Sequence, residues 1–129
     1  MRIQTGFFLL LCLLACGGCA KKSTDDLIAD LKSTNEKDRI IAVRLLADRK
    51  GDAAQTVPAL IEALKAKEGD VRWSAAIGLG YYGEEAKDAI PALQAAQNDR
   101  DARVREAAGV ALSRIDPSRF PAPSKARGK

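Results

Sequence analysis

The 129-residue chain contains no histidine. This absence excludes histidine metal ligands, histidine-ligated haem, and serine or cysteine nucleophiles activated by a neighbouring imidazole. Aromatic residues are also scarce, at 5% of the chain, whereas alanine is abundant, which favours closely packed short helices over a sandwich or barrel. The length allows one domain with short flanking segments. The composition therefore indicates a small helical protein without histidine-dependent chemistry.

Cysteine is confined to the start of the chain, at Cys12, Cys16 and Cys19. The rest of the sequence has none, so no disulfide and no cysteine-ligated metal can brace a domain formed there. We expect no metal site and no cofactor.

Positive charge is concentrated at the two ends of the chain. Its net charge is +4, from 21 lysine and arginine residues against 17 aspartate and glutamate residues. Seven basic residues lie outside residues 23–118: Arg2, Lys21, Lys22, Arg119, Lys125, Arg127 and Lys129. Subtracting these seven leaves 14 basic residues against the same 17 acidic residues, a net charge of −3. This mildly acidic middle argues against a nucleic-acid groove.

Residues 1–15 have the parts of an export signal. Arg2 and the amino terminus supply positive charge, and residues 7–15 form an unbroken apolar run. That run is too short to cross a bilayer of about 30 Å as a helix, but it is typical of a signal-peptide core. Small residues and cysteine follow it. We therefore expect the protein to be exported.

The end of the apolar run, Leu13-Leu14-Ala15-Cys16, resembles the lipobox of bacterial lipoproteins. The resemblance implies cleavage before Cys16, lipidation of its thiol, and a flexible tether over residues 16–24. Cys19 is the alternative lipidation site, and an ordinary cleaved signal with incidental cysteines is the alternative to both. The resemblance implies a location at the cell envelope, at the outer membrane or a periplasm-facing membrane. No aspartate follows either cysteine, so the inner-membrane retention signal of enteric-type lipoproteins is missing, which favours the outer membrane.

One pattern occurs three times with an offset of 33 residues. Its central copy has Leu60, Leu64, Val71, Arg72, Ala75 and Leu79; the later copy has Leu93, Gln97, Val104, Arg105, Ala108 and Leu112; the earlier copy has Leu27, Leu31, Asp38, Arg39, Ala42 and Leu46. Only Gln97 and Asp38 break type, and the arginine recurs in every copy. A fixed period of this length indicates a solenoid, in which each unit buries its apolar face against its neighbours.

Each copy reads as a pair of helices, over residues 25–51, 56–83 and 88–116. In the first pair we expect helices at about 25–32 and 36–49, with Asn35 capping the second. Leu27, Ile28 and Leu31 share a face of the first helix, and the second is expected to bury Ile41, Ala42, Leu45 and Leu46. Gly51 is expected to end the pair.

In the second pair, Pro58 suits the first turn of its helix; if that helix starts near residue 53, the proline lies inside it instead. The following helix should bury Val71, Ala75, Leu79 and Tyr82, a stripe at helical spacing. Gly78 and Gly80 within it predict a close approach of two helices. Gly83 is expected to end the helix.

In the third pair, Asp101 is the expected cap of the second helix. Gln97 replaces an apolar residue, as expected of a terminal unit whose outer side faces water. Residues 117–129 are rich in proline and basic residues and are expected to form a disordered tail, in which Phe120 can fold back over the last repeat.

The segments DVRWSAAIGLGYYG and RVREAAGVALSRI resemble HEAT repeats, in the short bacterial form similar to that of phycobilisome lyase proteins. The resemblance implies an all-α, short right-handed α-solenoid of about three helix pairs over residues 25–116. It further implies that Arg39, Arg72 and Arg105 form a hydrogen-bonded ladder between repeats. The motif predicts a fold but hardly any activity.

Trp73, Ile77 and Tyr81 form a second stripe, spaced i, i+4 and i+8, roughly opposite the buried one. The resemblance implies that the second helices line a concave surface, where HEAT proteins bind partners. An apolar stripe with a polar rim is a plausible hot spot for protein binding. The alternative is that this stripe packs against adjacent repeats.

We therefore expect a non-catalytic protein–protein interaction module, lipid-anchored at the bacterial cell envelope and monomeric, with an unknown protein partner and no nucleic acid. The lyase resemblance implies the alternative of a tetrapyrrole (bilin)-handling protein, lyase-like or chaperone. A further alternative is that the basic tail and tether bind anionic lipid headgroups.

Overall fold

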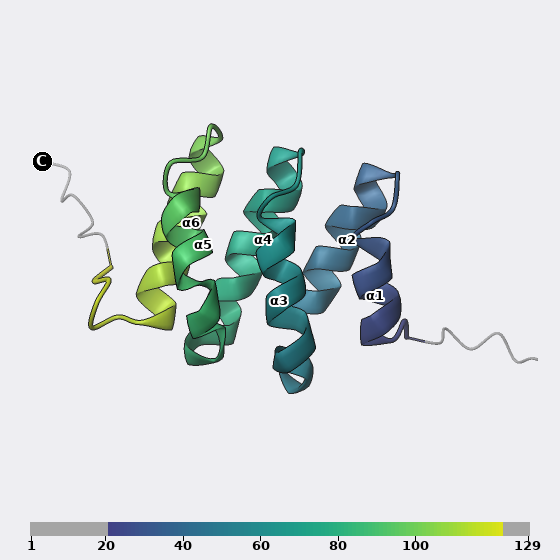
Figure 1. Ribbon diagram of the computed structural model, residues 1–129, viewed down its shortest axis with the longest axis horizontal. Helices are drawn as coiled ribbons and strands as arrows, with labels where there is room; N and C mark the ends of the chain where they lie inside the picture. Colours follow the sequence, from purple (N-terminus) through teal and green to yellow (C-terminus); the bar gives the residue numbers. More distant parts are fainter. Residues whose placement is uncertain (1–20, 123–129) are drawn as a thin grey trace, which may run out of the picture.

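The computed structural model describes residues 21–122. Within this range the chain is helical and contains no strand. The helices are α1 (Thr24–Asp30), α2 (Glu36–Ala47), α3 (Ala53–Ala63), α4 (Gly69–Tyr82), α5 (Ile90–Ala96) and α6 (Ala102–Ile115), with short 3₁₀ segments at Lys50–Asp52 and Gly83–Ala89. Figure 1 shows three pairs side by side, with α1, α3 and α5 in one layer and α2, α4 and α6 in the other. The predicted all-α solenoid is confirmed.

The layer of second helices carries most of the contact between repeats. Helix α4 packs against both α2 and α6, whereas α1 and α3 touch only sparsely. The repeat pattern supplies the core, because its leucines are fully buried: Leu27, Leu46, Leu60, Leu79, Leu93 and Leu112. Equivalent side chains from successive pairs thus form one continuous apolar seam, as a solenoid requires.

Close helix contacts occur where the second pair has glycine. A Cβ on Gly78 would lie 3.1 Å from the Cβ of Ala47, and one on Gly80 would lie 3.1 Å from the Cα of Ala111. Both predicted approaches are therefore confirmed, one toward α2 and the other toward α6. Gly83 ends α4 with φ 55°, a conformation that favours glycine.

Helix caps fix where several helices begin. Asn35 and Asp101 accept hydrogen bonds from the backbone of α2 and α6, as predicted. Helix α1 differs, because Ser23 caps it in a reciprocal capping box with Asp26. Thr24, the first residue of α1, is buried, and its hydroxyl donates to Asp52.

Two expectations for the second helix of the first pair are wrong. Ile41 and Leu45 are 53% and 44% exposed, whereas Val43 is fully buried beside Leu46. Ile41 and Leu45 occupy the positions of Ser74 and Gly78 on α4, which face the preceding helix pair. The first pair has no preceding pair within the described residues, so nothing covers these two side chains there.

The connection into α3 also differs from expectation. Gly51 lies in a 3₁₀ segment and has no positive φ, so it does not end α2 as a left-handed glycine. Helix α3 begins at Ala53, which places Pro58 inside it rather than in its first turn. Pro58 therefore lacks one helical hydrogen bond in this helix.

The residues after α6 cover part of the third pair, but not Gln97. Gln97 is exposed, and Phe120 is partly buried against the core. Residues 117–120, placed in the disordered tail by the sequence, form a turn in which the Arg119 and Phe120 amides donate to the Asp116 carbonyl. Residues 123–129 of that tail lie outside the described range.

Candidate functional site

Trp73, Ile77 and Tyr81 form a ridge along α4. Trp73 and Ile77 are partly buried and pack against the core, whereas Tyr81 is 51% exposed. All three line a groove toward α6 and a second groove toward α2. The stripe is thus neither fully packed nor fully free. We call these three residues the aromatic ridge.

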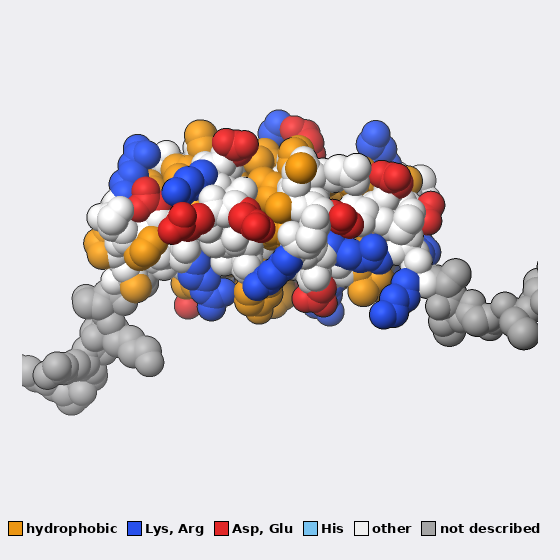
Figure 2. All heavy atoms as spheres, turned by 90° about the horizontal axis from the view of Figure 1, so that it is seen from below, with side chains coloured by type: hydrophobic (Ala, Val, Ile, Leu, Met, Phe, Trp, Pro, Cys, Tyr) orange, Lys and Arg blue, Asp and Glu red, His pale blue; other side chains and the backbone are white. Residues whose placement is uncertain are grey.

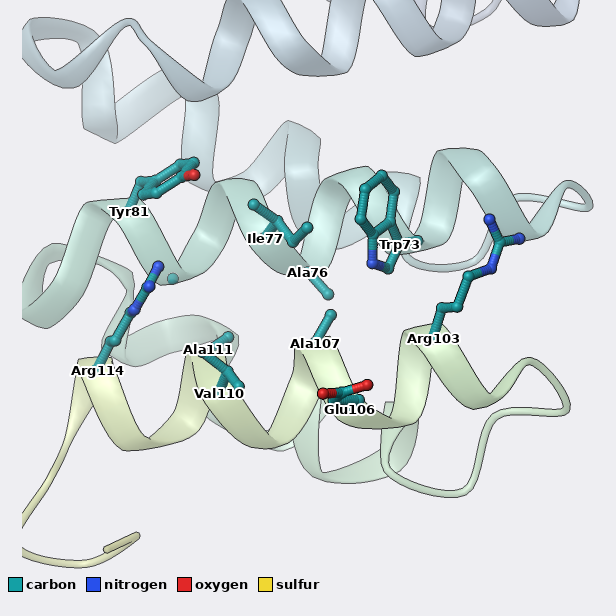
Figure 3. Close-up of a pocket in the computed structure, with 11 residues that line it drawn as sticks. Trp73, Ala76, Ile77, Tyr81, Arg103, Glu106, Ala107, Val110, Ala111 and Arg114 are labelled. Carbon is teal, nitrogen blue, oxygen red and sulfur yellow. The ribbon is translucent and has the colours of Figure 1, made fainter. Parts of the chain in front are cut away.

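The groove between α4 and α6 has a volume of about 430 Å³. Small residues make its floor: Ala76, Gly80, Ala107 and Ala111. The aromatic ridge forms one wall, and Val110 on α6 lies on the other (Figure 3). The close approach at Gly80 keeps the floor shallow, so the larger side chains of both helices rise above it.

Charged side chains stand at the two ends of this groove. Arg103 lies near Trp73, and Arg114 lies near Tyr81 (Figure 3). Arg103 is neutralised, because its Nη2 lies 2.8 Å from carboxylate oxygens of both Asp70 and Asp101. These hydrogen bonds from Arg103 lower the pKa of Asp101.

Arg114 and Glu106 are the unmatched charges of the groove. The Arg114 guanidinium lies 5.5 Å from the centre of the Tyr81 ring, a cation–π contact, and makes no ion pair within residues 21–122. Glu106 is exposed and likewise has no ion-pair partner in that range. Toward the Trp73 end the groove therefore offers Glu106 beside the neutralised Arg103, then an apolar middle, and Arg114 at the other end.

The groove between α2 and α4 measures about 320 Å³ and is lined by Arg44 and Asp48 as well as the aromatic ridge. The hydroxyl of Ser74, at its edge, is buried without a hydrogen-bond partner among the described residues. A third groove of about 830 Å³ lies between α1 and α3, with lysines on its rim at Lys32, Lys65 and Lys67.

The repeated arginines lie at the junctions between repeats. Each donates to backbone carbonyls of the turn before its own helix; Arg72, for example, donates to Ala66 and Lys67 at 2.8 Å. Arg39 also forms an ion pair with Glu68, and Arg72 donates two hydrogen bonds to the Asp99 carboxylate, at 2.8 and 2.9 Å. These two pairs each join one repeat to the next.

Arg105 differs because the described residues contain no further repeat after it. It bonds only to the carbonyls of Asp99 and Arg100. The Arg72–Asp99 pair is nearly buried, with side chains 7% and 13% exposed. Its hydrogen bonds raise the pKa of Arg72 and lower that of Asp99. Among the described residues, this pair is therefore the most buried ion pair between repeats.

Sequence reasoning found the aromatic ridge and the three arginines but missed the charges around the groove. In the sequence, Glu106 and Arg114 are recognisable only as the charged residues that follow Trp73 and Tyr81 by the offset of 33 residues. Their place at the groove depends on how α6 packs against α4, which the sequence pattern does not specify. Figure 2 shows acidic and basic side chains interspersed along the body, so the face in view carries no patch of one sign.

Several predicted features lie outside this part of the chain. Cys16 and Cys19 fall outside residues 21–122. Within that range, no three side chains of metal-binding type come together. None of its helices has both the length and the hydropathy to span a membrane.

Residues 24–118 match the family model described as HEAT repeats. The uncharacterized protein SkfG of Bacillus subtilis (strain 168) is 33% identical over 94 residues, which cover 73% of this chain and 53% of SkfG. A chain in the complex of CpcE and CpcF of phycocyanin lyase from Nostoc sp. PCC7120 has a similar structure, with a TM-score of 0.67 and 29% identity, over 78% of this chain and 40% of that one.

The chain thus spans about half the length of SkfG and less than half of the phycocyanin lyase chain. Its family match includes all three helix pairs and their repeated arginines. The chain belongs to the HEAT-repeat family.

Proposed function

We propose that this HEAT-repeat protein is a non-catalytic protein-binding module, held at the cell envelope by a lipid on Cys16, with Cys19 as the alternative. The binding surface is the aromatic ridge with the two grooves beside it. The partner inserts apolar side chains into these grooves.

The observation that carries the proposal is the incomplete burial of the aromatic ridge, with Trp73 and Ile77 partly buried and Tyr81 51% exposed. Tryptophan and tyrosine supply large contact areas at little entropic cost, and they dominate many protein interfaces. A ridge needed only for packing would be expected to be covered by its neighbours, as Leu79 and Tyr82 are on the opposite side of α4. Charges around the grooves supply the polar rim that accompanies such hot spots.

A non-catalytic role is supported by the side chains available. A serine nucleophile needs a neighbouring base. The Ser113 hydroxyl donates to the Val110 carbonyl at 2.8 Å, and the chain has no histidine. The carboxylates with lowered pKa, such as Asp99 and Asp101, pair with arginines that join repeats.

Replacing Trp73 with alanine tests the binding surface. The full chain in its membrane is crosslinked to its neighbours and purified, and the captured proteins are compared between wild type and Trp73→Ala. We expect the variant to lose specific crosslinks while its free energy of unfolding falls by less than about 3 kcal/mol, since Trp73 is only partly buried. Lys87→Ala, an exposed change on the Gly83–Ala89 segment, is the control.

A stability loss of about 3–5 kcal/mol, the cost of removing a fully packed tryptophan, would instead assign the ridge to the core. The anchor has its own test, incorporation of labelled fatty acid. Cys16→Ser should abolish labelling and Cys19→Ser should retain it. The reverse pattern would assign the lipid to Cys19. A wild type that, like both variants, incorporates no fatty acid would refute the anchor.

The second candidate is a tetrapyrrole-handling protein. It is favoured by the likeness to a chain of the phycocyanin lyase complex and by an aromatic-lined groove of about 430 Å³, a size typical of small-ligand sites. Incubation with a bilin should then produce a red-shifted absorbance that co-purifies with the wild type and disappears in Trp73→Ala. An unchanged bilin spectrum would reject this candidate.

A further inference from the structure

The exposed edge of α2 carries a pattern of side chains that matches the groove between α4 and α6. Lys37, Ile41 and Leu45 lie along one side of α2, at i, i+4 and i+8, and Asp48, the residue after the helix, continues this side at i+11 while also lining the groove toward α4. All four are exposed, and neither Lys37 nor Asp48 forms an ion pair within residues 21–122. We call these four residues the α2 edge.

From its N-terminal to its C-terminal end, this edge presents a basic side chain, two apolar side chains and an acidic side chain. Along the groove come Glu106, then Trp73, Ile77 and Val110, then Arg114. Arg103 lies beside Glu106, but its charge is neutralised by Asp70 and Asp101. The two surfaces are therefore opposite in charge at each end and apolar between. From Lys37 to Asp48 the helix rises about 16 Å, and from Glu106 to Arg114 about 12 Å, at roughly 1.5 Å per residue. The long side chains of lysine and arginine can span that difference.

We propose that the groove between α4 and α6 binds the α2 edge of a second copy of this chain. Lys37 of one copy faces Glu106 of the other, Asp48 faces Arg114, and Ile41 and Leu45 enter the apolar groove. The proposal rests on the proposed function in that it uses the same binding surface, and it names one occupant of that surface. Because the contact joins unlike surfaces, two copies can exchange edges reciprocally, or the contact can continue from copy to copy.

Stacking of copies end to end as a longer solenoid fits the structure poorly. Leu45 stands at the position equivalent to Gly78, where even a single added Cβ would lie only 3.1 Å from the Cβ of Ala47, so a leucine there blocks an equally close approach. Arg39 and Arg72 each pair with an acid in the loop of the following repeat. The equivalent loop of the first pair, residues 31–35, has no acid to receive Arg105 of another copy.

An anionic membrane surface is a poorer occupant of the α2 edge. The neighbouring helix α1 presents acidic side chains in its first turn, Asp25 and Asp26, and both are exposed. Exposed acids on a helix that contacts α2 oppose the approach of an anionic lipid surface.

Two differently tagged full-length copies, co-expressed and purified in detergent through one tag, test the proposal. The fraction of the second tag that co-purifies reports self-association. Ile41→Ser with Leu45→Ser should reduce this fraction at least about fivefold, because the apolar contact is lost. Circular dichroism should remain unchanged, since both side chains are exposed.

Charge exchange identifies the contacting pair. Lys37→Glu in both copies, or Glu106→Lys in both, should weaken co-purification about fivefold, because each change places like charges opposite one another. Both substitutions together should restore it. Lys50→Glu with Glu84→Lys, exposed charges away from the groove and the α2 edge, is the matched control and should change nothing.

Failure of the double exchange to restore association would overturn the proposal, as would wild-type copies that do not co-purify. In either case, crosslinks to another protein that still depend on Trp73 would leave the proposed function intact. If Trp73→Ala changes neither crosslinks nor self-association, the groove is not a binding surface and both proposals fail.

Discussion

Within residues 21–122, the same face of the second helix is covered in two repeats and open in the first. On α4 and α6 this face carries small residues, Ser74 and Gly78 or Ala107 and Ala111, and each is buried against the preceding helix. On α2 it carries Ile41 and Leu45, which are exposed. Small side chains allow helices to approach, and large ones at the open end cannot reproduce that packing. The open face is thus better suited to association than to stacking.

The polar links between repeats show the same contrast. Arg72 is buried between two repeats and pairs with Asp99, whereas Arg105, in the third pair, bonds within the described residues only to backbone carbonyls of the turn before its own helix. The repeated arginine is therefore expected to contribute more to the free energy of unfolding at a junction between repeats than in the third pair.

The largest effect is expected for Arg72→Ala. It leaves the Asp99 carboxylate without its partner in a nearly buried site, which should cost about 3–5 kcal/mol of the free energy of unfolding. Arg105→Ala should cost less than about 1.5 kcal/mol, because it removes only exposed bonds to carbonyls. Urea unfolding followed by circular dichroism measures both. Equal losses of the free energy of unfolding would show that Arg105 stabilises the fold as much as Arg72 does.

Next are the adjacent leucines of α2. Leu46→Ala should cost about 2–5 kcal/mol, because Leu46 is fully buried in the seam. Leu45→Ala should change the free energy of unfolding by about 0.5 kcal/mol or less, since its side chain is exposed. Thermal unfolding of both variants provides the measurement. A comparable loss at Leu45 would mean that the α2 edge is covered within the folded chain.

A smaller loss is expected where helices approach closely. Gly80→Leu should destabilise the fold by about 1–3 kcal/mol, because its side chain would meet α6 at Ala111. Gly51→Leu is the control, since a Cβ there has no neighbour within 4 Å. Chemical unfolding distinguishes the two. A tolerated Gly80→Leu would argue against tight packing of α4 on α6.

The smallest effect concerns pH. Arg72 lowers the pKa of Asp99 below its unfolded value. The Asp99 carboxylate therefore stabilises the fold above its ordinary pKa, and this contribution is lost as the pH falls through its lower folded value. Asp99→Asn should flatten, in part, the decline in free energy of unfolding below about pH 4. The same slope in both proteins would show that Asp99 does not titrate as proposed.

Most of the fold was predictable because its signals are local and repeated. The offset of 33 residues located the buried leucines, and glycines at 78 and 80 indicated the close helix contacts. The exposure of Ile41 and Leu45 was not predictable from the pattern, because an apolar residue on a helix gives no sign of whether a neighbouring repeat covers it. The position of Pro58 inside α3 likewise depends on how the preceding connection folds.

The candidate site was predictable only in part. The spacing of Trp73, Ile77 and Tyr81 placed the aromatic ridge on one face of its helix. The groove beside it is made by α6, and the roles of Glu106 and Arg114 at its ends follow from how α4 and α6 pack. Arg103 could not be separated from these two by sequence, because its neutralisation by Asp70 requires contact between repeats.

The central claim is that the aromatic ridge and the α2 edge are surfaces for association and not parts of the core. Trp73 is the chain's single tryptophan, so tryptophan fluorescence reports the surroundings of the aromatic ridge. We expect its emission to shift to shorter wavelength as protein concentration rises, and the shift to disappear in the Ile41→Ser, Leu45→Ser variant. Emission that is independent of concentration in the wild type, or a shift that persists in the variant, would contradict the claim.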